Sequence, residues 1–134
     1  MKRFLLDANV VIRFLRGDHP DHFQRSKALF EQAEKGSVRL ILLESVFAEI
    51  VFVLSSVYDI PRQRISDALQ PLLFHAGIEC RDSKILFDAL QRWCAKNVDF
   101  MDALLAAHAL DAQIPVASFD KDFRKFPDVH QHLP

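Results

Sequence analysis

The chain contains little cysteine, glycine and proline, the residues that are typical of disulfide-rich secreted proteins and of turn-rich β proteins. Its 134 residues include two cysteines, three glycines and six prolines. Two cysteines cannot build the disulfide framework of a small secreted protein, and Cys80 and Cys94 do not have zinc-finger spacing. We therefore expect thiols in a reducing compartment. So few glycines and prolines also argue against an all-β protein with many tight turns.

The sequence also lacks a strong net charge and a long hydrophobic run. Its formal charge of −1 excludes the global basic field of a nucleic-acid coat protein, although a local basic rim stays compatible. Residues 40–54 are the most apolar region, but they carry Glu44 and Glu49 and are too short to cross a bilayer. The N-terminal segment is interrupted by Asp7 and has no cleavage site. We expect a cytoplasmic protein.

Hydrophobic residues are abundant, and they alternate between two periodicities. Half of the residues are hydrophobic and twelve are phenylalanine, which is typical of one domain, residues 1–134, with a proper core. Short apolar runs predict strands, 3.6-residue periods predict helices, and Asn9 is expected to cap the first helix. The residues after 123 are expected to form a loose tail. We expect strands at 3–6, 38–43, 78–80 and 116–119, and helices around 10–15, 23–35, 44–58, 63–75, 82–96 and 98–110.

This alternation predicts an α/β fold with a mostly parallel sheet, and it places four acids at notable positions. Asp7 and Asp120 each follow a short apolar strand directly, so both are expected at the carboxyl edge of the sheet. Asp102 and Glu49 are expected on otherwise apolar helix faces. For Glu49, within the stretch VFAEIVFVL, three interpretations are open: a helix edge that reaches water, a structural ion pair, or part of a site.

Four carboxylates gathered in one cleft without Lys or Arg partners would repel one another, and their pKa values would rise. A hard divalent cation removes that repulsion, because Mg²⁺ and Mn²⁺ prefer oxygen ligands. Two such ions could activate a water and stabilise the leaving oxygen of a phosphodiester. The acids therefore predict a magnesium or manganese site and phosphodiester hydrolysis.

Four motifs in this order, LLDANVVIRFL, FAEIVFVL, VDFMDALLAAHAL and ASFDKDFRKF, resemble the PIN domain. More narrowly, they resemble the VapC ribonuclease toxins of toxin–antitoxin pairs. The resemblance implies a three-layer α/β/α sandwich, Mg²⁺- or Mn²⁺-dependent cleavage of RNA, and neutralisation by a VapB-like antitoxin. It also implies a homodimer or a hetero-oligomer with the antitoxin. The catalytic and metal-binding residues that it implies are Asp7, Glu49, Asp102 and Asp120.

The chain departs from the family pattern in one place and carries additional acids. Ala8 stands where the family usually has Thr or Ser, whereas Asn9 fits the pattern and Ser118 retains a hydroxyl near Asp120. We expect Asn9 and Ser118 to support the acids. Three further acids are interpreted as helix-start or solvated turn residues rather than ligands: Glu44, Asp99 and Asp122.

Other functions and sites remain open alternatives at this stage. The chain could be a housekeeping PIN-domain RNA-processing nuclease, a phospho-acceptor module or an inactive binding module. Phe52, Val53 and Val57, with the helix around residues 69–74, either pack in the core or leave an apolar groove for a dimer contact or a partner helix. Histidines such as His108 are interpreted as packed or solvated rather than as zinc ligands. Several basic side chains either line an RNA path or are ordinary surface charges: Arg3, Arg13, Arg16, Arg62, Arg64 and Lys121.

Overall fold

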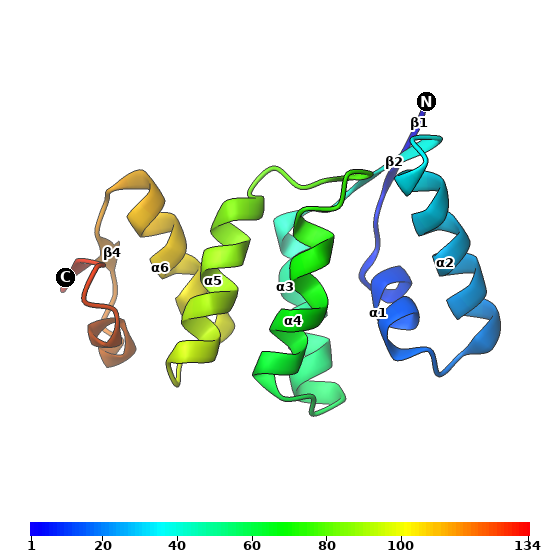
Figure 1. The fold of residues 1–134 in the computed structure, drawn as a ribbon. Coiled ribbons are helices and arrows are strands. Elements are labelled where there is room, and N and C mark those ends of the chain that lie inside the picture. Colours follow the sequence, from blue (N-terminus) through cyan, green and yellow to red (C-terminus); the bar gives the residue numbers. More distant parts are fainter. The chain divides into compact units, whose positions relative to one another are not determined.

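The computed structural model describes residues 1–134, which divide into two compact units, Met1–Ser83 and Lys84–Pro134. Figure 1 shows the elements of both units along the chain. None of the helices has the length and apolar character that a membrane crossing requires.

The N-terminal unit contains a three-stranded parallel sheet in the order β1-β2-β3. The strands are β1 (Lys2–Leu5), β2 (Val38–Ile41) and β3 (Ile78–Glu79). Leu40 is the central residue of this register, because it lies opposite Phe4 on one side and Ile78 on the other. Its side chain is fully buried, as expected for the middle strand of a parallel sheet. The predicted α/β class with a parallel sheet is confirmed.

Four α-helices and a π-helical turn lie between these strands in the sequence: α1 (Ala8–Arg16), α2 (Pro20–Glu34), α3 (Glu44–Phe52), η1 (Val53–Val57) and α4 (Arg62–Leu73). Helix α2 packs against β2 and α1, and α1 also contacts α3. Phe14 of α1 joins the first two helices, since its ring centroid lies 5.7 Å from that of Phe23 and 5.0 Å from that of Phe30. These ring contacts fix the angle between α1 and α2.

Two helix starts differ from the prediction, for local chemical reasons. Asp7, not Asn9, caps α1, because an Asp7 carboxylate oxygen accepts a hydrogen bond from the Ala8 amide at 2.9 Å. Helix α2 begins at Pro20, three residues earlier than expected. Proline is favoured in the first helical turn, and Nδ1 of His19 accepts a hydrogen bond from the His22 amide at 3.1 Å.

The C-terminal unit combines two helices with a small parallel sheet. Its elements are α5 (Ser83–Ala95), which begins at the last residue of the N-terminal unit, α6 (Phe100–Ala112), β4 (Val116–Ala117), the 3₁₀ helix η2 (Lys121–Lys125) and β5 (Gln131–His132). Trp93 of α5 contacts Phe100 of α6 edge-on, with ring centroids 5.8 Å apart. The prediction of a loose tail is wrong, because β5 pairs with β4 and the side chains of Phe126 and Val129 are buried.

An ion-pair cluster fastens this tail to α5. Arg92, whose exposed fraction is only 9%, donates hydrogen bonds to both carboxylate oxygens of Asp128 at 2.9 and 2.6 Å. Its Nε also donates to Asp88 at 3.1 Å. The hydrogen bonds from Arg92 lower the pKa of the Asp128 carboxyl below its ordinary value. Bidentate pairs of this kind have defined geometry, so the cluster fixes the chain just before β5.

Gly77 supplies a test of the packing beneath the sheet of the N-terminal unit. A methyl group at this position would lie 2.3 Å from the carbonyl oxygen of Ala33 in α2. We therefore expect Gly77→Ala to lower the free energy of unfolding by about 1–3 kcal/mol, because either α2 or the start of β3 must shift. Urea denaturation measures this loss.

The matched control is Ala76→Ser, which adds one heavy atom at the exposed neighbouring position. Its effect should stay within about 0.5 kcal/mol. Equal unfolding free energies for the two variants would contradict the close approach of Gly77 to α2.

Candidate metal-binding site

The loop after β4 holds Asp120 through backbone hydrogen bonds. The Ser118 hydroxyl accepts a hydrogen bond from the Asp120 amide at 2.9 Å. The Asp120 carboxylate in turn accepts one from the Asp122 amide at 2.9 Å and so caps η2. Both bonds are short-range Asx- and Ser-type turns, which a Ser-x-Asp-x-Asp sequence favours. The loop therefore presents Asp120 in a fixed conformation.

Gln131 also holds this loop, and it was missed in the sequence. Its side-chain amide donates hydrogen bonds to the carbonyl oxygens of Ser118 at 2.8 Å and Asp120 at 2.9 Å. Gln131 can reach both because β5 lies parallel to β4. No motif or period marks Gln131, so only the pairing of the tail with β4 reveals it.

Three carboxylates meet in the C-terminal unit. Asp102, in the first turn of α6, presents an oxygen that lies with oxygens of Asp120 and Asp122 in a group whose members are all within 4.8 Å of one another. The structure therefore brings two of the predicted site residues together. It adds Asp122, which the sequence had led us to treat as a solvated turn residue; Lys125 forms an ion pair with Asp122 at 3.0 Å.

The environment of Asp102 disfavours its ionised form. Burial raises the pKa of the Asp102 carboxyl most, and repulsion from Asp120, Asp99 and Asp122 raises it further. The donor set is entirely oxygen and anionic, which fits a hard divalent cation such as Mg²⁺ or Mn²⁺. A cation at these oxygens would relieve the repulsion that raises this pKa.

The first predicted acid lies in the N-terminal unit, at the start of α1. Asp7 is exposed, and one of its carboxylate oxygens accepts the Ala8 hydrogen bond described above. Its charge is favourable there, because the amino end of a helix carries partial positive charge. Ala8, the departure from the family pattern, is buried. Asn9 is exposed in the first turn of the same helix.

Glu49 lies in the middle of α3, and its surroundings separate the three interpretations that the sequence left open. Its side chain is exposed, and its helical neighbour Phe52 is 64% exposed. Glu49 takes part in no ion pair. The structural ion pair is therefore excluded among the three interpretations, and Glu49 reaches solvent at a helix edge. A role for Glu49 in the site stays a prediction.

Several remaining candidates are accounted for by local contacts. Asp99 occupies the N-cap position of α6, as expected for a helix-start acid, although its side chain forms no capping bond. Glu44 lies in the first turn of α3. Arg3 forms an ion pair with Glu79 at 2.9 Å, and the Arg16 guanidinium lies 4.2 Å from the centre of the Tyr58 ring. Arg3 and Arg16 are therefore already engaged within the N-terminal unit.

Comparison of the sequence with known proteins shows the family of the chain. The sequence profile of the PIN domain matches residues 4–129. The chain belongs to the PIN-domain family. This PIN domain is 25% identical over 122 residues to a protein named VapC ribonuclease from Aquifex aeolicus (strain VF5), and the match covers 90% of both chains. It is 27% identical over 140 residues to Ribonuclease VapC31 from Mycobacterium tuberculosis (strains CDC 1551 / Oshkosh and H37Rv), with 98% of both chains covered.

The raised pKa of Asp102 gives this PIN domain a testable pH dependence in the absence of metal. Because the pKa in the folded state lies above the unfolded value, the ionised side chain opposes folding at neutral pH. This penalty disappears as the pH falls below the unfolded value of about 4. We expect Asp102→Asn to raise the melting temperature at pH 7. The corresponding gain in the free energy of unfolding should be less than about 1 kcal/mol, because the site is partly solvated. Thermal unfolding between pH 7 and pH 3 measures the effect.

Asp128→Asn is the matched control with the opposite sign. The pKa of Asp128 is lowered, so its charge contributes stability above the unfolded pKa, and this contribution is lost as the pH falls through the folded pKa. The control should melt at a lower temperature than the wild type at pH 7. A lower melting temperature for Asp102→Asn at that pH would show that Asp102 is a structural ion-pair acid.

Proposed function

We propose that this PIN domain is an endoribonuclease that requires Mg²⁺ or Mn²⁺ and that residues 1–134 form one catalytic domain. The observation that carries the proposal is the oxygen-only cluster of Asp102, Asp120 and Asp122 in a chain whose relatives are named ribonucleases. The residues proposed to hold the metal and to catalyse cleavage are Asp7, Glu49, Asp102 and Asp120. Asn9 and Ser118 are proposed to support them.

The proposed reaction is hydrolysis of an RNA phosphodiester, in which a water oxygen attacks phosphorus and a ribose oxygen leaves. When bound, a divalent ion would polarise the phosphate and make a water more acidic. The chain's own residues supply position and charge. Ser118 and Gln131 hold the backbone of Asp120, and the first turn of α1 holds Asp7. No Ser, Cys or His nucleophile is required for this chemistry.

The direct test compares cleavage of single-stranded RNA in the presence of Mn²⁺. We expect Asp7→Asn and Asp102→Asn each to lower the cleavage rate by about 100-fold or more, because each removes an anionic oxygen from the metal ligands. Fluorescence release from a labelled oligoribonucleotide measures the rate.

Asp99→Asn is the control, since it removes the same charge three residues before Asp102 at an exposed position. It should cleave at close to the wild-type rate. Equal cleavage by the wild type, Asp7→Asn and Asp102→Asn would exclude the carboxylate mechanism.

We further propose that the chain is the toxin of a VapBC-type pair, bound by a VapB-like antitoxin, and that it forms a homodimer or a hetero-oligomer with that antitoxin. The relatives named VapC support this role over nearly the full length of the chain. The N-terminal unit also exposes large apolar side chains on consecutive helical segments, Phe52 at 64% and Val57 at 65%. Exposed apolar groups of this kind suit a partner helix. A housekeeping RNA-processing nuclease is the alternative.

Growth measurements separate the toxin from the housekeeping nuclease. Expression of the wild type alone should arrest growth, and Asp102→Asn, produced at the same soluble level, should not. Co-expression of a short neighbouring open reading frame that encodes an antitoxin should restore growth. Normal growth with an enzyme that cleaves RNA in vitro would support the housekeeping alternative instead.

A further inference from the structure

We propose that the hollow between α1 and α2 binds one nucleotide of the RNA strand next to the bond that is cut, with its two flanking phosphates on Arg13 and Arg25; this inference rests on the proposed ribonuclease function. The hollow has a volume of about 530 Å³ and belongs entirely to the N-terminal unit. Its lining combines cationic, polar and apolar side chains: Asn9, Val10, Arg13, His22, Arg25, Ser26 and Leu29.

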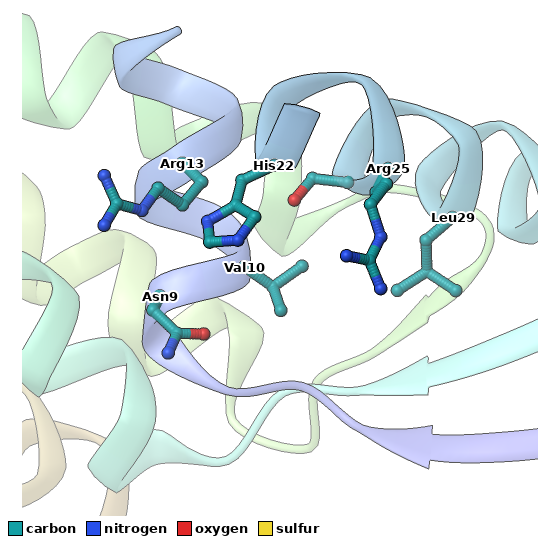
Figure 2. Close-up of a pocket in the computed structure, with 7 residues that line it drawn as sticks. Asn9, Val10, Arg13, His22, Arg25 and Leu29 are labelled. Carbon is teal, nitrogen blue, oxygen red and sulfur yellow. The ribbon is translucent and has the colours of Figure 1, made fainter. Parts of the chain in front are cut away.

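The lining matches the parts of a nucleotide. Figure 2 shows the polar ends of Asn9, His22 and Arg25 arranged around the side chain of Val10. Two guanidinium groups line the hollow and no carboxylate does, although the chain as a whole has a formal charge of −1. Guanidinium groups match phosphate oxygens in two-point hydrogen bonds. An apolar floor beside an imidazole and an amide suits a nucleobase, which needs a stacking surface and an edge partner.

The two arginines remain available to an external anion. Arg13 lies 3.8 Å from Asp18, and Arg25 lies 3.6 Å from Asp21. Both distances are long for charged hydrogen bonds, and all four side chains are substantially exposed. Exposed ion pairs of this kind contribute little stability. A phosphate that places two of its oxygens on one guanidinium group can therefore displace the aspartate partner.

The imidazole of His22 is already held in place before any ligand binds. Its ring stacks on that of His19, with centroids 3.7 Å apart and an angle of 20° between the planes. The His19 ring is itself oriented, because its Nδ1 accepts a hydrogen bond from the backbone amide of His22. Because the stack on His19 restricts the ring, a base that packs against it costs less conformational entropy than ordering a free side chain.

The hollow follows the proposed catalytic acid along one helix. Asp7 caps α1, Asn9 and Val10 lie in its first turn, and Arg13 lies one turn further. At 1.5 Å per residue, Arg13 is about 9 Å along the helix axis from Asp7. A strand seated in the hollow therefore runs along α1 toward the Asp7 end, where the adjoining phosphodiester would lie.

The test measures binding of a labelled single-stranded oligoribonucleotide by the full chain carrying Asp7→Asn, which leaves the RNA uncut. Arg25→Gln in this background should weaken binding about 5-fold at 0.1 M salt and reduce the slope of log affinity against log salt by about 0.7, since one phosphate contact is lost. Lys27→Gln is the matched control, because Lys27 is on the same helix but lines a different hollow. Its slope and affinity should equal those of the background.

A second variant tests the base-binding side of the hollow. His22→Ala should weaken binding about 5-fold without a change in the salt slope, and the loss should vanish with an oligomer that is abasic throughout.

In the active chain, Arg25→Gln should raise KM for RNA and leave kcat nearly unchanged, because Arg25 binds the strand beside the cut.

The outcomes separate this inference from the proposed function. Failure of the wild type to cut RNA would overturn both the proposed function and the inference that rests on it. If the wild type cuts RNA but Arg25→Gln and Lys27→Gln bind it with equal affinity and slope, only the nucleotide site is overturned. Weaker binding of an acidic peptide by Arg25→Gln, with RNA binding unchanged, would also overturn it and would assign the hollow to a protein partner.

Discussion

The central physical constraint in the C-terminal unit is the closeness of like charges. Oxygens of Asp102, Asp120 and Asp122 lie within 4.8 Å of one another, and this repulsion would push the loop after β4 away from α6 if the loop were free to move. Two neutral hydrogen bonds from Gln131 oppose that movement by fixing the carbonyls on either side of Phe119. Gln131 is placed in turn by the β4–β5 pairing and by the chain that Arg92 anchors through Asp128. The acidic cluster thus depends on a tail that carries none of its acids.

Local patterns in the sequence were sufficient to predict much of the fold. The alternation of short apolar runs with helical periods predicted strands near β1, β2, β3 and β4 and helices near α1 to α6, because those signals extend over only a few residues. The position of Asp7 and Asp120 directly after apolar strands was also readable, since it needs only the strand ends. The family motifs carried the same assignment, and the match over residues 4–129 confirms membership.

What the sequence could not reveal depends on contacts between distant residues. The two-residue strand β5 has no period of its own, and it forms because Arg92 holds Asp128, 36 residues later. Gln131 and the part that Asp122 plays in the cluster were missed for the same reason. The sequence also left the exposure of Glu49 open, because its eight apolar neighbours do not show which helix face finds a partner, and the packing leaves Phe52 and Glu49 facing solvent. Hydrophobic runs record composition, not which helix face finds a partner.

A metal-dependent ribonuclease of the proposed kind must also attract a polyanion. The net charge of −1 gives no long-range attraction, so the compensating charge must be local. Helix α1 provides this arrangement along a single rigid element: Asp7 lies at its amino end, where negative charge is favoured, and Arg13 and Arg16 lie in its last turn, where positive charge is favoured. The same helix dipole therefore stabilises both signs and keeps them apart. Asp7 and Arg13 are about 9 Å apart along the helix axis and so do not pair with each other, which leaves the acid available to a cation and the arginine of the hollow available to a phosphate.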